Sequence, residues 1–256
     1  MTYKFQTPAI FLIGPTASGK TETSLRLAEE FPLEIISVDS AMVFKEMNIG
    51  TCKPSLQNLE NVPHHLINIL QPDAEFDVGI FIRYVDSAIQ TIIQNKKIPL
   101  FVGGTMMFHK VLFDGIHDFP RDDSLREEID HIRRNKGYQL LLNELELLDP
   151  ETFQLIDKKN PRRVQRALEI IKLTKTKLSL LKKEPSKKFL NSENCLILGM
   201  NDSKNNLDIS VEKRLRSIIE DGLINELEKL INTYKLTSES HSMNSINYKQ
   251  FFPYVE

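Results

Sequence analysis

The sequence has few cysteines and no long apolar run, and both absences narrow the classes of protein to which it can belong. Only Cys52 and Cys195 are cysteines. They form neither a disulfide framework nor a Cys-x-x-Cys motif, so a reducing, intracellular compartment is the simpler interpretation. No apolar stretch approaches the roughly 18 residues that a membrane span needs, and the N-terminal residues lack the features of a signal peptide. We therefore expect a cytoplasmic protein without a membrane segment.

A large excess of either charge is also missing. The formal net charge is −2 at pH 7. A nucleic-acid partner would therefore have to be held by a local basic patch, and not by the charge of the whole protein. The 256 residues are enough for one large domain, or for one core that carries an insertion.

Three short apolar runs predict buried parallel strands. They lie at residues 9–13, 33–38 and 99–102, and helical spacings of apolar residues occur between them, at 20–30 and 81–94. Alternation of strand and helix predicts an α/β fold with a parallel sheet. In such sheets ligands bind beyond the C-terminal ends of the strands, and here all three strands end in polar or glycine-rich residues.

The first predicted strand runs into a complete P-loop motif, G-x-x-x-x-G-K-[ST]. Its residues are Gly14, Pro15, Thr16, Ala17, Ser18, Gly19, Lys20 and Thr21. The glycines let backbone N–H groups point at phosphate oxygens, Lys20 and the helix N-terminus add positive charge, and the Thr21 hydroxyl can bind Mg²⁺. Because the motif follows a strand and opens a helix, we favour a phosphate site over a chance match.

The other strand ends carry weaker signals. Asp39 and Ser40 follow the second strand, where a carboxylate could hold Mg²⁺ or act as a general base. A helix cap or an Asx turn explains this pair equally well. Residues 103–105 (Gly-Gly-Thr) follow the third strand and could approach a phosphate or form a plain turn. His64 and His65 have no partner at metal-ligand spacing, so packing or capping is favoured over ligation.

Between about residues 120 and 190 the strand signals disappear and charged helical patterns replace them, which predicts a helical insertion. Residues 157–190 contain twelve basic and three acidic residues, a local charge of +9. Val164 belongs to an apolar stripe at helical spacing, and Arg162 and Arg166 share another face. Such a segment can follow a nucleic-acid backbone, but taken alone a solvated helix face is the slightly favoured alternative.

Seven motifs in a fixed order resemble those of the tRNA dimethylallyltransferases, also called tRNA isopentenyltransferases. They are Gly14–Thr21, Ile36–Ala41, Ile49–Pro54, Pro63–Leu66, Pro99–Met106, Arg163–Glu169 and Tyr248–Gln250. Together they span nearly the entire chain, and seven motifs in register are specific. With this resemblance the sequence predicts a P-loop NTPase-like parallel sheet core, formed by residues 1–118 and 192–256. Residues 119–191 are predicted to form a helical, tRNA-binding insertion.

The family transfers a dimethylallyl group from dimethylallyl diphosphate to the exocyclic amine of the adenine adjacent to the tRNA anticodon. The resemblance implies that Gly14 to Thr21 cradle the diphosphate, that Thr21 meets Mg²⁺ and that Arg214 reaches the diphosphate. Asp39 would accept the proton of the amine, and Thr105 would lie at the reacting centre. Contacts with the tRNA anticodon stem-loop are implied for Asp39, Ser40, Ala41, Met42, Arg162, Arg163, Val164, Gln165, Arg166, Asn247, Tyr248 and Lys249.

The sequence also departs from the family pattern. Phe44 and Phe108 stand where the family usually has tyrosine, Asn247 where it usually has glycine, and the family usually continues beyond Tyr254. We expect an active, monomeric transferase. Two alternatives stay open: a C-terminally shortened remnant that folds or binds tRNA with little or no activity, and a P-loop kinase of small molecules, for which no lid with phosphate-binding arginines is evident.

Overall fold

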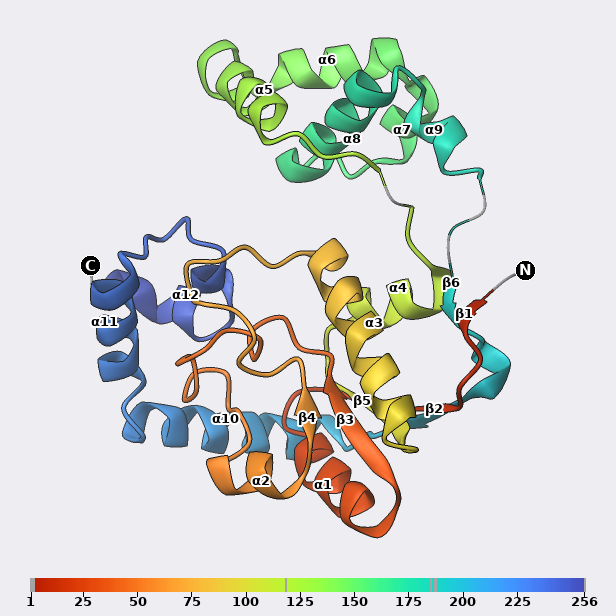
Figure 1. The fold of residues 1–256 in the computed structure, drawn as a ribbon. Coiled ribbons are helices and arrows are strands. Elements are labelled where there is room, and N and C mark those ends of the chain that lie inside the picture. The colour runs from red at the N-terminus through yellow and green to blue at the C-terminus, as the bar shows by residue number, and fades with distance from the viewer. Residues whose placement is uncertain (1–2, 118, 185, 187, 256) are drawn as a thin grey trace. The chain divides into compact units, whose positions relative to one another are not determined.

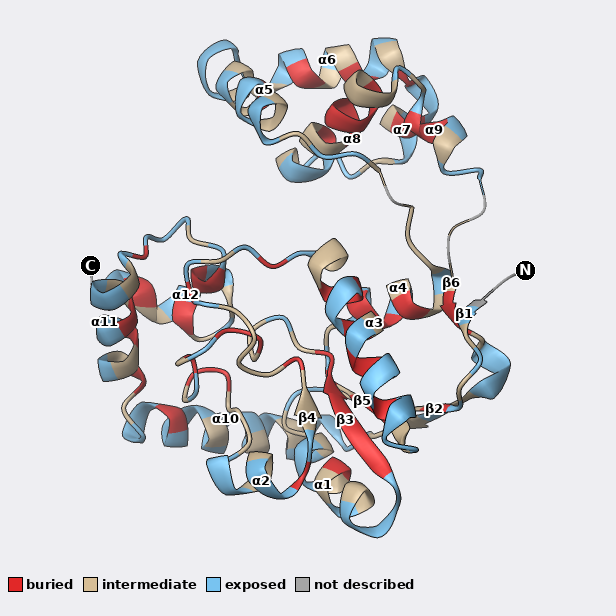
Figure 2. Ribbon diagram, viewed as in Figure 1, coloured by how far each residue is buried: buried red, intermediate tan, exposed pale blue. Residues whose placement is uncertain are grey.

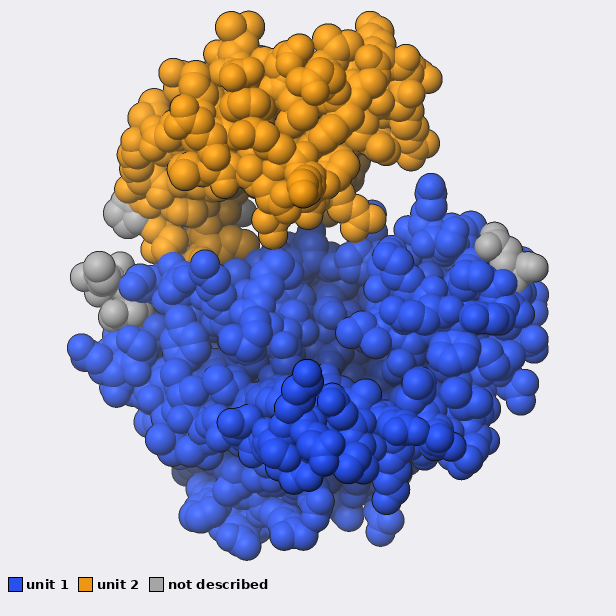
Figure 3. Space-filling model, turned by 180° about the vertical axis from the view of Figure 1, so that it is seen from behind, with its two compact units in different colours: residues 1–114, 188–256 blue, residues 115–187 orange. Residues whose placement is uncertain are grey.

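A computed structural model of the chain describes residues 3–117, 119–184, 186 and 188–255. The chain divides into two compact units, drawn in different colours in Figure 3. The core unit consists of residues 1–114 and 188–256, and the helical unit of residues 115–187. The helical unit begins and ends four residues before the predicted insertion, so the predicted boundaries were wrong by that amount. The later boundary moves because Lys188–Leu190 form strand β6, which pairs with β1 (Tyr3–Phe5) of the core unit.

A five-stranded parallel sheet lies at the centre of the core unit (Figure 1). The strand order is β4-β3-β5-β2-β7, and every neighbouring pair is parallel. The predicted fold, an α/β parallel sheet core with a helical insertion, is confirmed. The strands of this sheet are β2 (Ala9–Ile13), β3 (Leu33–Ser37), β4 (His64–His65), β5 (Ile98–Val102) and β7 (Cys195–Gly199).

Helices cover both faces of the middle of this sheet, which explains why the inner strands β2 and β5 are apolar without alternation. One face packs on α1 (Lys20–Glu30) through a cluster that includes Ile35 and Leu100. The other packs on α3 (Val78–Gln94) and α4 (Met106–Asp114) through a larger cluster that includes Ile36 and Phe101. Figure 2 shows β3 buried along its length. The remaining helices of the core unit are α2 (Leu56–Asn61), α10 (Lys204–Glu220), α11 (Leu223–Tyr234) and α12 (Tyr248–Phe251).

The helical unit has an apolar core of its own. The core gathers Ile129, Leu141, Leu145, Val164 and Leu168, all without exposed surface. Side-chain caps begin three of its helices, because Asp122, Asp149 and Asn160 accept a backbone N–H of the first turn. Its helices are α5 (Asp123–Lys136), α6 (Tyr138–Leu148), α7 (Pro150–Leu155), α8 (Pro161–Thr174) and α9 (Leu178–Leu181).

Within the described residues, none of the helices has both the length and the apolar character that a membrane span requires.

Candidate functional site

The P-loop connects β2 to α1 and has the backbone conformation of an anion cradle. Gly19 precedes the helix at φ 83°, and Ala17 also has a positive φ of 63°. The ammonium group of Lys20 donates to the carbonyl oxygens of Gly14 (2.9 Å) and Pro15 (2.6 Å). The buried hydroxyl of Ser18 has no hydrogen-bond partner among the described residues. A buried hydroxyl without a partner is costly, and an oxygen of a bound anion would satisfy it.

A cavity of about 390 Å³ opens beside the P-loop, at the C-terminal ends of β3 and β5. The P-loop residues from Thr16 to Thr21 line it, together with Asp39, Gly103, Gly104 and Arg214. The sequence predicted that three strand ends meet here, and the structure brings all three together. An apolar part of the wall consists of Ile35, Met42, Ile67 and Val102.

Asp39 forms the Asx turn that was one of the two interpretations of the sequence, and its side chain also lines the cavity. Its Oδ1 accepts the backbone N–H groups of Ala41 (2.8 Å) and Met42 (3.1 Å), which is an Asx turn. The same side chain lines the cavity, and for Oδ2 no hydrogen-bond partner is found in the described part of the chain. The turn therefore fixes the orientation of the carboxylate at the wall of the cavity.

Two cationic groups and one anionic group act on each other in this cavity. The pKa of Lys20 is lowered, first by burial and then by the positive charge of Arg214, while the negative charge of Asp39 opposes both. Arg214 comes from α10, and its Nε donates to the Sγ of Cys52 at 2.9 Å. Burial and a neighbouring guanidinium are the conditions under which an anionic ligand is bound most strongly.

A second cavity, of about 730 Å³, adjoins the first and shares Ala17, Pro54 and Arg214 with it. Its wall includes Cys52 and Lys53, which belong to the motif Ile49–Pro54 but were given no role from the sequence. Lys53 donates to the carbonyl oxygen of Phe44 and to the side-chain oxygens of Asn48 (3.2 Å) and Asn68 (2.7 Å). Burial lowers the pKa of Lys53 to about 8. All three N–H groups of the ammonium have acceptors, so Lys53 holds the surrounding loops in place.

Thr105 lies just before α4 and is bound through its backbone. Its N–H donates to the carbonyl oxygen of Val38 at 3.3 Å, and its own carbonyl oxygen accepts from Phe108 and His109. Gly103 and Gly104 line the first cavity, and Thr105 is not in that lining. Its place at the reacting centre stays a prediction.

Two residues predicted to contact tRNA have fully buried side chains. Val164 is fully buried in the core of the helical unit, as its place in the apolar stripe requires. Tyr248 is fully buried in the core unit, where its hydroxyl donates to Glu226. A motif shows which residues occur together, and it does not show which of them reach solvent.

The arginines of α8 divide into two groups. Arg162 and Arg163, in the first turn, are exposed. Arg166 is instead bound within the helical unit, where it donates to the carbonyl oxygens of Phe119 (3.1 Å) and Pro120 (2.9 Å). The first pair is therefore more exposed to solvent than Arg166.

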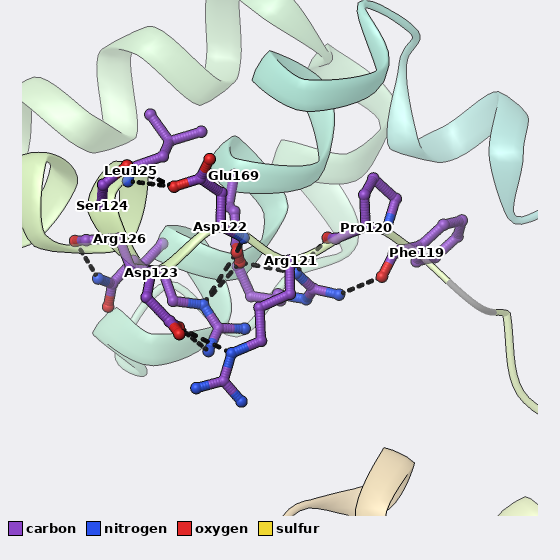
Figure 4. A network of polar contacts seen from close by, with 11 residues as sticks. Phe119, Pro120, Arg121, Asp122, Asp123, Ser124, Leu125, Arg126 and Glu169 are labelled. Atoms are coloured by element: carbon purple, nitrogen blue, oxygen red, sulfur yellow. Dashed lines mark hydrogen bonds and ion pairs between the residues drawn. The ribbon is translucent and has the colours of Figure 1, made fainter.

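Arg166 also belongs to an ionic network around Glu169, part of which is drawn in Figure 4. The fully buried carboxylate of Glu169 accepts from Arg166 Nη1 (2.7 Å), Arg126 Nε (2.9 Å) and the backbone N–H of Asp122 (3.0 Å). Gln165 donates to the carbonyl oxygen of Arg126 at 2.8 Å. These contacts fasten the first residues of α5 to α8.

The remaining residues predicted to contact tRNA lie in the core unit. Ser40 and Lys249 are exposed, whereas Ala41 and Met42 are half-buried. Asn247 has a positive φ of 75°, which accounts for the glycine that the family usually has there.

Fold and site together define an α/β P-loop protein with a helical insertion, and comparison with known proteins identifies its family. Residues 42–256 match the IPP transferase family, and residues 8–72 match the isopentenyl transferase family. The chain belongs to the IPP transferase family. The predicted resemblance is confirmed, and the kinase alternative is set aside.

Individual relatives agree with this assignment. The chain is 36% identical over 246 residues to the tRNA dimethylallyltransferase of Francisella tularensis subsp. novicida (strain U112), covering 96% of this chain and 80% of the relative. It is 39% identical over 248 residues to tRNA dimethylallyltransferase 2 of Geotalea uraniireducens (strain Rf4), covering 96% and 79%. The chain thus spans about four fifths of the length of these relatives.

Solved structures give the same result. The tRNA isopentenylpyrophosphate transferase of Bacillus halodurans matches with a TM-score of 0.66 at 32% identity, over 98% of this chain and 78% of that one. A eukaryotic dimethylallyltransferase acting on tRNA matches with a TM-score of 0.82 at 28% identity, over 98% of this chain and 63% of that one.

Proposed function

We propose that the protein transfers a dimethylallyl group from dimethylallyl diphosphate to the exocyclic amine of the adenine adjacent to the tRNA anticodon. The observation that carries the proposal is the cavity in which the P-loop, Arg214 and Asp39 meet beside an apolar wall. Its cationic end suits a diphosphate, and its apolar wall suits a five-carbon isoprenoid group. The relatives named tRNA dimethylallyltransferase support the same reaction.

The proposed reaction assigns a task to each of these groups. The bond between C1 of the dimethylallyl group and the diphosphate oxygen breaks, and negative charge grows on the leaving diphosphate. The P-loop N–H groups, Lys20 and Arg214 stabilise that charge where it develops. The amine nitrogen of adenine forms the new bond to C1, and Oδ2 of Asp39 accepts the proton that the nitrogen loses.

Mg²⁺ is part of the proposal. Thr21 lines the cavity and offers a hydroxyl, an oxygen ligand of the kind that Mg²⁺ prefers. Mg²⁺ is commonly held by one or two protein ligands together with substrate phosphates and water. Bound there, the ion would neutralise charge on the diphosphate.

The tRNA partner follows from the basic character of α8. Arg162 and Arg163 are exposed in its first turn, and phosphate contacts from such residues supply a large share of the affinity for nucleic acids. We propose that they grip the anticodon stem-loop, whose target base must leave its stack to enter a pocket. We expect a monomer that acts in the cytoplasm, where tRNA is found.

The decisive experiment incubates the protein with isotopically labelled dimethylallyl diphosphate, Mg²⁺ and an anticodon stem-loop, and analyses the nucleosides by mass spectrometry. We expect a prenylated adenosine. The matched control is the same stem-loop with purine, which lacks the amine, in place of the target adenine, and it should stay unmodified. A protein that binds both substrates without forming the product would support the remnant interpretation instead.

A further inference from the structure

One carboxylate of α11 holds a turn that lies far away in the sequence. Glu226 accepts the backbone N–H groups of Asn48 (2.9 Å), Ile49 (2.9 Å) and Gly50 (3.2 Å). Three consecutive N–H groups converge on one anion, and hydrogen bonds to an ionised acceptor are stronger than those between neutral groups. The conformation of this turn therefore depends on Glu226.

Tyr248 encloses the same carboxylate. Its hydroxyl donates to Oε1 of Glu226 at 2.5 Å, and Asn247 Nδ2 donates to the carbonyl oxygen of Gly50 at 2.7 Å. A Cβ at Gly50 would come within 2.5 Å of the Tyr248 ring, so only glycine fits there. Burial, followed by the charge of Glu226, raises the pKa of Tyr248, so the phenol remains a donor at neutral pH.

The turn continues directly into Cys52, whose thiol meets Arg214. The Cys52 N–H donates to the carbonyl oxygen of Ile49 at 3.0 Å, and the backbone of Cys52 is held at φ 54°. This left-handed conformation is uncommon for a residue other than glycine and persists only where neighbouring contacts fix it. The Sγ of Cys52 accepts from Arg214 Nε at 2.9 Å. Because a guanidinium group is planar, fixing Nε fixes the plane in which its other N–H groups lie.

We propose that Glu226 and Cys52 are positioning residues for Arg214: the Glu226 carboxylate fixes the Asn48–Gly50 turn, and the Cys52 thiol that follows the turn orients the Arg214 guanidinium toward the P-loop cavity. This inference rests on the proposed function, in which Arg214 binds the diphosphate. It gives the Asn247–Tyr248 segment a task inside the core unit, different from the predicted contact of Tyr248 with tRNA.

The first experiment uses calorimetry to measure how tightly the 256-residue chain binds inorganic diphosphate in the presence of Mg²⁺. Glu226→Gln and Cys52→Ala should each weaken this binding by about tenfold, because small displacements of a positioned group have effects of this size or larger. Cys52→Ser restores an acceptor for Nε and should recover most of the affinity. The affinity for the anticodon stem-loop should not change.

A matched control separates positioning from loss of stability. Glu46 forms a similar link between these segments, since it accepts from the Tyr234 hydroxyl at 2.6 Å and pairs with Lys229 at 3.1 Å. It lines neither cavity. Glu46→Gln should lower the melting temperature without weakening diphosphate binding. An equal loss of binding in Glu46→Gln would mean that any weakening of this region has the same effect, and would overturn the proposal.

The second measurement repeats the substitutions in an Arg214→Ala background. If Glu226 and Cys52 act through Arg214, they should then cause no further loss of diphosphate binding. Losses that persist without Arg214 would contradict the proposed order of action. If the wild-type protein binds diphosphate but does not prenylate the stem-loop, the proposed function fails, while the binding comparison still decides this inference.

Discussion

At the scale of single residues, Asp39 allows the sharpest test of the chemistry, because the proposed base role falls on Oδ2 while Oδ1 accepts the N–H groups of the Asx turn. Asn at this position keeps an oxygen that can accept from Ala41 and Met42 but removes the base. We expect Asp39→Asn to lower kcat by about 10²- to 10⁴-fold with tRNA binding nearly unchanged. Asp39→Ala, which also loses the turn, should weaken tRNA binding as well. A parallel fall of binding and rate in Asp39→Asn would argue against the base role.

Glu34 should determine how the core unit responds to acid. Its buried carboxylate pairs with His65 at 2.7 Å and accepts from Asn95 at 2.9 Å. Burial raises its pKa, but the hydrogen bonds from His65 and Asn95 outweigh burial, so the pKa in the folded protein lies below its ordinary value.

At pH values between the pKa of Glu34 in the folded protein and its ordinary pKa in the unfolded chain, the unfolded chain binds more protons than the folded one. The free energy of unfolding therefore falls as the pH falls through this window. At pH values above the ordinary glutamate pKa, the free energy of unfolding of the wild type should exceed that of Glu34→Gln by about 1–3 kcal/mol. The difference should shrink in more acidic solution, as urea titrations at several pH values would show. A difference that does not change with pH would mean that the carboxylate charge contributes nothing.

Individual site residues could be predicted from the sequence to the extent that they are neighbours in it. The P-loop and Asp39 were found because each follows a recognisable strand. The contact between Arg214 and Cys52 joins residues 162 positions apart, and no periodicity relates them, although the family resemblance did indicate Arg214. The burial of Tyr248 could not be predicted, because it depends on packing against Gly50 and Glu226.

At the scale of elements, α8 carries both the arginines proposed to bind RNA and the residues that anchor it within its own unit. Arg162→Ala with Arg163→Ala should leave the helical unit folded and reduce the slope of log affinity for tRNA against log salt by roughly 1–2. Arg166→Ala should instead destabilise the helical unit, because Glu169 loses one of its two guanidinium partners. Salt titrations of stem-loop binding, with circular dichroism as a check on folding, distinguish these results. An unchanged slope in the double variant would remove both arginines from the interface.

At the scale of the whole molecule, the sequence predicted two units because composition changes sharply where the insertion begins. The later boundary lies a few residues before the predicted one, since the three-residue strand β6 is too short to show a periodicity. The structure adds that α4, which ends at Asp114, packs against β6, which begins at Lys188. The two points where the insertion leaves and re-enters the core unit are thus neighbours in space.

This neighbourhood makes removal of the helical unit a test of how the two units divide the work. Each unit has its own apolar core, so a chain in which a short Gly-Ser linker replaces residues 115–187 should fold. We expect it to bind diphosphate with Mg²⁺ as the full chain does, since the P-loop, Asp39 and Arg214 all remain. It should bind the stem-loop as weakly as the full chain does at a salt concentration that abolishes binding. Calorimetry and fluorescence anisotropy would measure the two affinities. Undiminished tRNA binding by the shortened chain would locate recognition in the core unit and refute the role proposed for α8.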